Sequence, residues 1–248
     1  MIILYANLFL ILADRKSAVA GEGSVQSQKR SVGEECVVLL HGLGRTRLSM
    51  RFLYNLFVDD GYRVWSKSYP STKNTIKKLS NDTITKALNY CQTGSNKQVH
   101  FVTHSLGGIL LRVYLQDRTI ANMGNIVMLS PPNHGSEVVD ALKDNFLFQF
   151  FLGPAGQQLG TGEGSIPLSL KPVEGVIGII IGNRSYEPWF SSTLRGPNDG
   201  KVSTHSAKLS EMRDYLVVQS GHTYIMDDEA VIQQMRHFLL HSQFLKSR

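Results

Sequence analysis

A serine stands where a predicted strand meets a predicted helix near the middle of the chain. QVHFVT (98–103) has the β-branched and aromatic composition of a buried strand, and LGGILLRVYLQ (106–116) has the apolar spacing of a helix. Ser105 lies at the corner between them, where the first helical N–H groups and the positive end of the helix dipole stabilise negative charge. Ser105 is therefore a candidate nucleophile. The alternative is that Ser105 only caps the helix.

A glycine-rich turn follows an earlier apolar run, VVLLHGLGRT (37–46). Its glycines would let the backbone N–H of Leu43 point at the same spot as the N–H of Leu106, and two such donors form an oxyanion hole. An ordinary turn between strand and helix is the alternative. A phosphate loop is excluded, because the segment has neither the Lys-Ser/Thr ending nor the G-x-G-x-x-G pattern.

A serine nucleophile needs a general base, and that base needs a third group to orient it. His222 follows the strand-like run LVVQS and a glycine, and Asp199 lies in an Asn-Asp-Gly turn after the run GVIGIII. Both are expected at the carboxyl ends of strands, as Ser105 is. Taken singly, His222 could be a surface histidine and Asp199 part of a common turn. Their order along the chain, Ser, acid, His, favours a catalytic triad.

Several segments together resemble the α/β-hydrolase superfamily, and within it the small bacterial lipase- and esterase-like proteins. The resemblance runs from about Val37 to Phe238, and one departure from the pattern is Thr103, where glycine is usual. The segments that carry it are VVLLHGLG, VTHSLGG, SPPNHGSE, GPAGQQLG, PNDGKVS and SGHTYIM.

The resemblance implies a role for each candidate residue. Ser105 would be the nucleophile, His222 the general base and then the general acid, and Asp199 the orienting acid. The N–H groups of Leu43 and Leu106 would be the oxyanion donors. No metal and no organic cofactor is required for this chemistry.

Other titratable residues near these motifs have structural interpretations. We expect His104 to pack near the turn, His41 to brace the oxyanion loop and His134 to shape a turn near the site. Asp227 and Asp228 precede the last predicted helix, where carboxylates suit a helix N-terminus.

Short β-rich runs alternate with amphipathic stretches from residue 36 onward. This alternation predicts an α/β protein with a mostly parallel sheet and helices on both faces. The resemblance implies the α/β-hydrolase fold with a sheet of about six strands. The strand-like runs are 36–40, 62–69, 98–103, 125–130, 175–181 and 215–220, and the helical patterns lie near 48–60, 74–92, 106–117, 137–152 and 228–243.

The bulk composition favours one globular domain, assigned to residues 36–248. The net charge of +6 permits attraction to anionic surfaces, including a transient contact with a membrane surface. The charge is scattered, however, and forms no basic patch with interleaved aromatic residues, so nucleic acid is not an expected partner. The two cysteines and eight histidines lack the spacing of a metal site.

The first twenty residues resemble a signal peptide, because an apolar run precedes Ala18-Val19-Ala20, and the polar residues 21–35 are expected to be a linker. We therefore expect a periplasmic or secreted protein. A cytoplasmic one is the alternative, because no Lys or Arg precedes the apolar run. Cys36 and Cys91 are both expected at the amino-terminal edge of the sheet, and export would favour a disulfide between them. Two separate buried thiols are the alternative.

A serine at this turn favours attack on an acyl carbon, so a small-molecule or lipid ester is the expected substrate. The same triad would also serve an acyltransferase, a thioesterase or an amidase. A catalytically silent lipid-binding protein on this scaffold is a further alternative.

Four phenylalanines lie in residues 146–151, within a segment expected to form a small cap over the site at about 137–170. The segment is too aromatic for one narrow helical stripe. We expect Phe150 and Phe151 to line an acyl-binding groove. The alternative is that these side chains complete the core.

Overall fold

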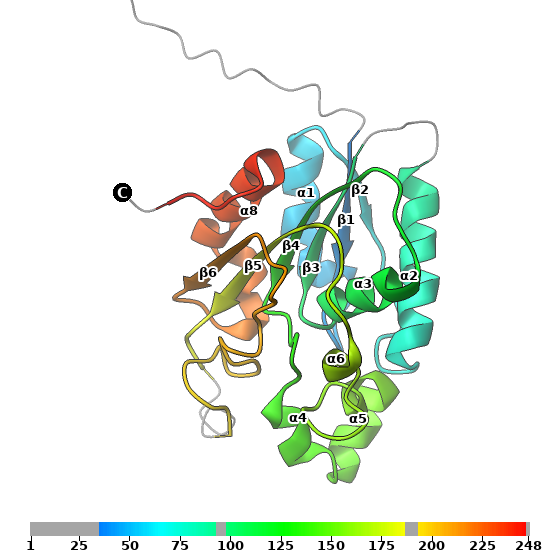
Figure 1. The fold of residues 1–248 in the computed structure, drawn as a ribbon, viewed down its shortest axis with the longest axis vertical. Helices are drawn as coiled ribbons and strands as arrows, with labels where there is room; N and C mark the ends of the chain where they lie inside the picture. The colour runs from blue at the N-terminus through cyan, green and yellow to red at the C-terminus, as the bar shows by residue number, and fades with distance from the viewer. Residues whose placement is uncertain (1–34, 93–97, 187–192, 247–248) are drawn as a thin grey trace, which may run out of the picture. The chain divides into compact units, whose positions relative to one another are not determined.

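Six parallel strands form the central sheet of the protein (Figure 1). The computed structural model describes residues 35–92, 98–186 and 193–246. The spatial order of the strands is β2-β1-β3-β4-β5-β6, which confirms the prediction of a mostly parallel sheet of about six strands. The strands are β1 Cys36–Leu40, β2 Arg63–Ser66, β3 Val99–His104, β4 Met123–Leu129, β5 Val176–Gly182 and β6 Asp214–Val218.

The described residues form one compact unit. The predicted signal peptide (1–20) lies outside the described residues, as does the predicted linker except for Glu35. No helix in the described part of the chain is long and apolar enough to cross a bilayer.

The central strands are covered on both faces, which explains their continuous apolar sequences. Every residue of β1 and β3 is buried. Neighbouring side chains of a strand point to opposite faces, so Phe101 joins one apolar core and Val102 the other. The parallel register pairs Leu40 with Thr103 and His104 with Leu129. The residues that follow β1, β3 and β4 therefore leave the sheet at one edge.

Four long helices cover the two faces, as the sequence predicted (Figure 1). Helices α2 (Ile76–Cys91) and α3 (Leu106–Asp117) pack on the Phe101 side, and α1 (Arg51–Asp59) and α8 (Glu229–His241) pack on the Val102 side. Two 3-10 helices, η1 (Arg47–Met50) and η2 (His222–Asp227), precede α1 and α8. Asp228 caps α8 as predicted by accepting from the N–H groups of Ala230 and Val231, whereas Asp227 ends η2.

The segment between β4 and β5 differs from its prediction. One helix was expected over 137–152, but the chain forms α4 (Glu137–Leu142) and α5 (Phe146–Gln157), followed by the short α6 (Ile166–Ser169). The side chain of Asn145 starts the second helix by accepting from the N–H of Leu147 at 2.9 Å. Gly153 then kinks α5 with a φ of 61°, and a Cβ there would lie 1.7 Å from the carbonyl oxygen of Thr72.

A disulfide joins Cys36, the first residue of β1, to Cys91, the last residue of α2. The expected placement at the amino-terminal edge of the sheet is confirmed, and the alternative of two buried thiols is wrong. The bond closes a sequence separation of 55 residues. By loop-closure entropy a loop of that length stabilises the folded chain by about 4 kcal/mol.

Candidate active site

Ser105 occupies a strained turn between β3 and α3. Its φ of 52° and ψ of −119° are uncommon for a residue with a side chain. The start of α3 lies close against the end of β1, because a Cβ on Gly107 would lie 2.7 Å from the carbonyl oxygen of Leu40. A Cβ on Gly42 would lie 2.9 Å from Nδ1 of His104. The two glycines therefore allow the turn after β1 to approach Ser105 closely.

Thr103, the departure from the family pattern, is accommodated by a glycine on the helix. The Thr103 side chain is fully buried, and its Oγ1 has no hydrogen-bond partner among the described residues. A Cβ on Gly108 would lie 3.2 Å from that oxygen. Gly108 on α3 thus leaves the space that the side chain of Thr103 on β3 occupies.

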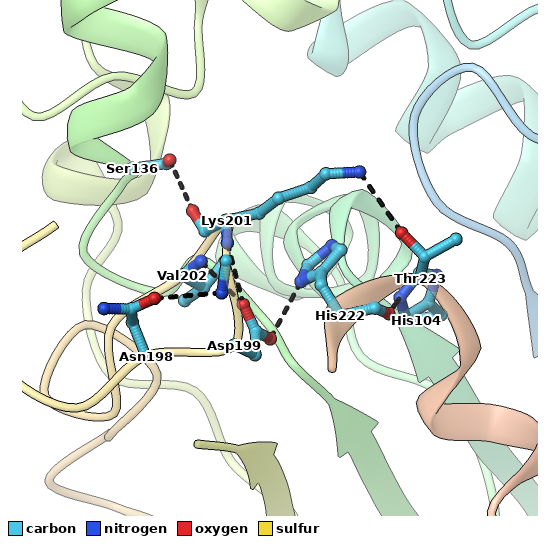
Figure 2. A network of polar contacts seen from close by, with 9 residues as sticks. His104, Ser136, Asn198, Asp199, Lys201, Val202, His222 and Thr223 are labelled. Carbon is cyan, nitrogen blue, oxygen red and sulfur yellow. Dashed lines mark hydrogen bonds and ion pairs between the residues drawn. The ribbon is translucent and has the colours of Figure 1, made fainter. Parts of the chain in front are cut away.

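The structure brings Asp199 and His222 together (Figure 2). Nδ1 of His222 lies 2.9 Å from Oδ2 of Asp199, and the other carboxylate oxygen accepts from the N–H groups of Lys201 at 3.0 Å and Val202 at 2.8 Å. Burial alone would raise the pKa of Asp199, but the charge and hydrogen bond of His222, with the N–H of Lys201, hold the pKa below its usual value. The ionised carboxylate keeps the proton of His222 on Nδ1, which leaves Nε2 as an acceptor.

The loop that carries Asp199 is fixed by its own polar groups. Gly200 has a φ of 99°, and its N–H donates to Oδ1 of Asn198 at 3.0 Å. The N–H of His222 donates to the carbonyl oxygen of Asp199 at 3.0 Å, so backbone and side chain both join these residues. Oγ of Ser136 donates to the carbonyl oxygen of Lys201 at 2.6 Å, which ties the loop to the residue before α4 (Figure 2).

His134 lies at the turn that precedes α4. Its N–H donates to the carbonyl oxygen of Ser206 at 3.0 Å, and its Nδ1 lies 3.1 Å from the same oxygen. His134 therefore fixes a turn, in agreement with the prediction from the sequence.

His104 supports the backbone of His222. Its Nε2 lies 3.0 Å from the carbonyl oxygen of His222, and the two ring centroids are 4.9 Å apart. Burial, and next the nearby charge of His222, hold the pKa of His104 well below its usual value. A neutral His104 then donates from Nε2. The sequence predicted a packed His104, but nothing in it indicated this contact with a residue 118 positions away.

His41 braces the turn after β1, as predicted. Its ring stacks on Tyr69 with centroids 3.8 Å apart, its Nε2 accepts from the Tyr69 N–H at 3.2 Å, and its Nδ1 donates to the carbonyl oxygen of Gly42 at 2.9 Å. The Tyr69 hydroxyl donates to the carbonyl oxygen of His41. Burial lowers the pKa of His41 to about 4, so the ring is neutral in this arrangement.

Two backbone N–H groups adjoin Ser105 without an acceptor. Neither the N–H of Leu43 nor that of Leu106 has a hydrogen-bond partner within the described part of the chain. Leu106 is the first residue of α3, where no intrahelical acceptor exists. The following residue, Gly44, has a φ of 66°, and its N–H donates to Oγ of Ser71 at 3.0 Å, which fixes the course of the loop.

A cavity of about 290 Å³ opens above Ser105 and His222, which both line it. Residues from the segment between β4 and β5 make one side of the cavity apolar. They are Val138, Val139, Leu142, Leu152 and Leu159. Arg45, Lys201 and Thr223 also line the cavity. Among the described residues, no three His, Cys, Asp or Glu side chains gather into a group that could hold a metal ion.

Phe150 and Phe151 lie on α5 outside the residues that line this cavity. Their side chains are 79% and 64% exposed, so the alternative that they complete the core is wrong. The next residue, Leu152, does line the cavity. Contact of the two phenylalanines with a substrate stays a prediction.

Comparison with solved structures defines the class of fold. No protein-family model matches the chain, and no curated protein matches its sequence. The mature form of lipase BlEst2 from Bacillus licheniformis is similar, with a TM-score of 0.66 and 17% identity over 83% of this chain and 91% of that one. Phospholipase PlaB from Legionella pneumophila gives a TM-score of 0.60 and 15% identity, over 82% of this chain and 57% of that one.

Lipase B from Aspergillus fumigatus gives a TM-score of 0.62 and 15% identity, over 84% of this chain and 53% of that one. The chain thus spans nearly all of the first of these structures and little more than half of the other two. These likenesses and the all-parallel sheet show that the protein has the α/β-hydrolase fold.

Proposed function

We propose that the protein is a serine hydrolase that cleaves carboxylic esters through an acyl-enzyme on Ser105. The observation that carries this proposal is that Ser105 and His222, the hydrogen-bond partner of Asp199, both line one cavity with an apolar side. The similar structures, which are two lipases and a phospholipase, support the same class of reaction.

The proposed reaction has two stages. Nε2 of His222 takes the hydroxyl proton of Ser105 as Oγ attacks the ester carbonyl, and the N–H groups of Leu43 and Leu106 stabilise the oxyanion. His222 then gives the proton to the leaving alcohol, which breaks the ester bond and leaves the acyl group on Ser105. Water, deprotonated by His222, then attacks the acyl carbon. His222 returns that proton to Oγ of Ser105 as the bond between the acyl carbon and Oγ breaks, which releases the acid and restores the serine.

Asp199 acts in this proposal through its charge. It is fully buried beside the imidazole of His222, and its pKa lies below the usual value, so it stays ionised while His222 gains a proton. An ionised Asp199 stabilises the imidazolium that forms in each stage and fixes the tautomer needed to start it.

The acyl chain is expected to lie against the apolar side of the cavity, formed by residues of α4 and α5 and by Leu159. We expect chains of medium or long length to be accepted. Phe150 and Phe151 are proposed to contact the part of a long chain that extends past Leu152 to the surface. In this proposal residues 137–170 are a small cap over the site.

We propose a periplasmic or secreted location. The Cys36–Cys91 disulfide supports it, because such bonds form and persist in oxidising compartments. The exposed phenylalanines of α5 and the net positive charge support a transient contact with an anionic lipid surface.

Hydrolysis of p-nitrophenyl esters of increasing chain length tests the function. We expect saturable release of p-nitrophenol, with kcat/KM rising from acetate to octanoate as more of the chain contacts the apolar wall. Folded protein that hydrolyses none of these esters would contradict the proposal.

A further inference from the structure

Two histidines lie one turn apart at the carboxyl end of α8. His237 and His241 are four positions apart, so their side chains lie on the same face of the helix. Their ring centroids are 4.3 Å apart, with 40° between the ring planes. Figure 1 shows this end of α8 well away from α4 and α5, which supply the apolar side of the catalytic cavity. The two histidines are therefore a cluster separate from the triad.

A backbone carbonyl fixes the orientation of the first ring. Nδ1 of His237 lies 2.8 Å from the carbonyl oxygen of Gln243, in the segment that follows α8. Because a carbonyl oxygen only accepts, Nδ1 carries the proton of the neutral ring and Nε2 has an available lone pair. Histidines that bind metal ions commonly donate their other ring N–H to a carbonyl or carboxylate, which holds the ring and its tautomer. His237 already has this arrangement.

The other ring nitrogens of the two residues are not used within the described part of the chain. No side chain or backbone group there bonds to Nε2 of His237 or to either ring nitrogen of His241. His237 is partly buried and His241 is exposed, so an ion from solvent can reach both rings. The adjacent basic residue, Arg236, pairs with Asp60 at 2.6 Å, which balances its charge.

We propose that His237 and His241 together bind one divalent transition-metal ion, with water in its remaining coordination positions. Imidazole nitrogen suits Cu²⁺, Ni²⁺ and Zn²⁺, whereas Mg²⁺ and Ca²⁺ prefer oxygen ligands. Two histidines four positions apart on one helix also supply two of the zinc ligands in metalloproteases with the H-E-x-x-H pattern. The sequence lacks the spacing of sites with three or four protein ligands, and this site uses two.

The position of the pair on the helix favours a bound cation. His241 is the last residue of α8, and the carboxyl end of a helix carries partial negative charge. A bound ion joins two successive turns of α8 and, through the hydrogen bond of His237 to Gln243, the segment that follows. Because the unfolded chain does not hold the two imidazoles on one face, the ion binds the folded protein more tightly and stabilises it.

Titration calorimetry of the full chain, free of metal and without an affinity tag, tests the proposal. The protein is titrated at pH 7.5 with CuCl₂, NiCl₂, ZnCl₂ or MgCl₂. We expect one transition-metal ion per chain, with Cu²⁺ bound more tightly than Ni²⁺ or Zn²⁺, and no binding of Mg²⁺. Saturating NiCl₂ should also raise Tm, and EDTA should reverse that increase.

Variants locate the site. His237→Gln and His241→Gln are each expected to weaken Ni²⁺ binding by about a hundredfold, because a single imidazole loses the advantage of two linked ligands. Each should also remove the increase in Tm. His205→Gln is the matched control, because His205 is an exposed histidine whose ring centroid lies 6.5 Å from that of His134. This variant should bind Ni²⁺ as the wild-type protein does.

The proposal does not depend on ester hydrolysis, since it concerns residues outside the catalytic cavity. Wild-type protein that binds none of the three transition-metal ions would overturn it. Binding that His237→Gln and His241→Gln leave unchanged, or that His205→Gln weakens as much as they do, would overturn it as well. Loss of binding in both paired variants and retention in the control would establish the two histidines as the ligands.

Discussion

The loops that carry the triad and the segment that carries the apolar wall are held in different ways. Ser105, Asp199 and His222 are buried, and hydrogen bonds or close glycine contacts fix each of them. In the segment between β4 and β5, α5 is kinked, and its Phe150 and Phe151 side chains lie in solvent. Reacting atoms must be positioned to within fractions of an ångström. Binding of an apolar chain, in contrast, depends on how much apolar surface area it buries.

This difference predicts different consequences of substitution in the two regions. Changes in the triad loops should lower the rate for every ester. Changes in α5 should alter the choice among esters and leave the chemistry intact.

The largest expected effect follows removal of the nucleophile or the base. Ser105→Ala and His222→Ala should each lower kcat by on the order of 10⁵-fold, because neither an acyl-enzyme nor proton transfer remains. The double variant should lose little more than either single one, since the two residues act as a unit. Steady-state kinetics with p-nitrophenyl butyrate measures this. A reduction of kcat in the double variant equal to the product of the two single reductions would show that Ser105 and His222 act independently, which would contradict this prediction.

Asp199→Asn should leave more activity. The amide keeps the shape of the side chain but loses the charge that stabilises the imidazolium, and we expect kcat to fall by on the order of 10³- to 10⁴-fold. The reduction should be the same for short and long acyl chains, because Asp199 does not line the cavity. A loss that depends on chain length would contradict its assignment to the chemistry.

His41 predicts a pH dependence of stability in the triad region. Its pKa is about 4 in the folded protein, against 6.5 for an ordinary histidine. The unfolded chain therefore binds this proton first as the pH falls, and the folded state loses up to about 3 kcal/mol between pH 6.5 and pH 4. The contribution is fully present above pH 6.5.

Chemical denaturation at pH 7, 5.5 and 4.5 measures this dependence, with the His41→Gln variant as the comparison. The variant should lose less unfolding free energy than the wild-type protein as the pH falls. The lowered pKa of His104 also makes the unfolding free energy decrease as the pH falls, but it does so in both proteins and therefore cancels in the comparison. Identical pH profiles would show that His41 does not titrate as its burial requires.

The smallest effect is expected for Phe150 and Phe151. Replacing both by alanine should lower kcat/KM for a decanoate ester by about three- to tenfold, the value of one or two lost apolar contacts, and leave an acetate ester nearly unchanged. Phe52→Ala is a matched control, because Phe52 is an exposed phenylalanine on α1 that does not line the cavity. Equal losses on both esters would place these residues outside the substrate path.

The strands of the sheet and their order along the chain were predictable, because a strand buried on both faces has a continuous apolar sequence. Continuous runs such as CVVLL and GVIGIII are apolar throughout, and all six strands formed at the predicted runs, with ends that differ by at most three residues. The placement of Cys36 and Cys91 at one edge followed from the same reasoning, since β1 begins and α2 ends there, but the choice between a disulfide and two thiols did not.

Contacts between distant segments left no local signal. The break at Asn145 depends on one side-chain cap, and the kink at Gly153 on the approach of Thr72 from another loop. The hydrogen bond between His104 and His222 and the arrangement of Arg45 and Lys201 around Thr223 likewise depend on how loops pack. Periodicity reports which face of an element is buried, and it carries no information on such pairings.

Labelling with a fluorophosphonate tests the central claim most directly. The reagent phosphonylates a serine only when a base and an oxyanion hole activate it, so it reports on the triad without a choice of substrate. We expect one adduct per protein, mapped by mass spectrometry to Ser105, and none after His222→Ala. The absence of an adduct from the folded wild-type protein, or an adduct on Ser136 in the same cavity, would contradict the assignment of Ser105 as the nucleophile.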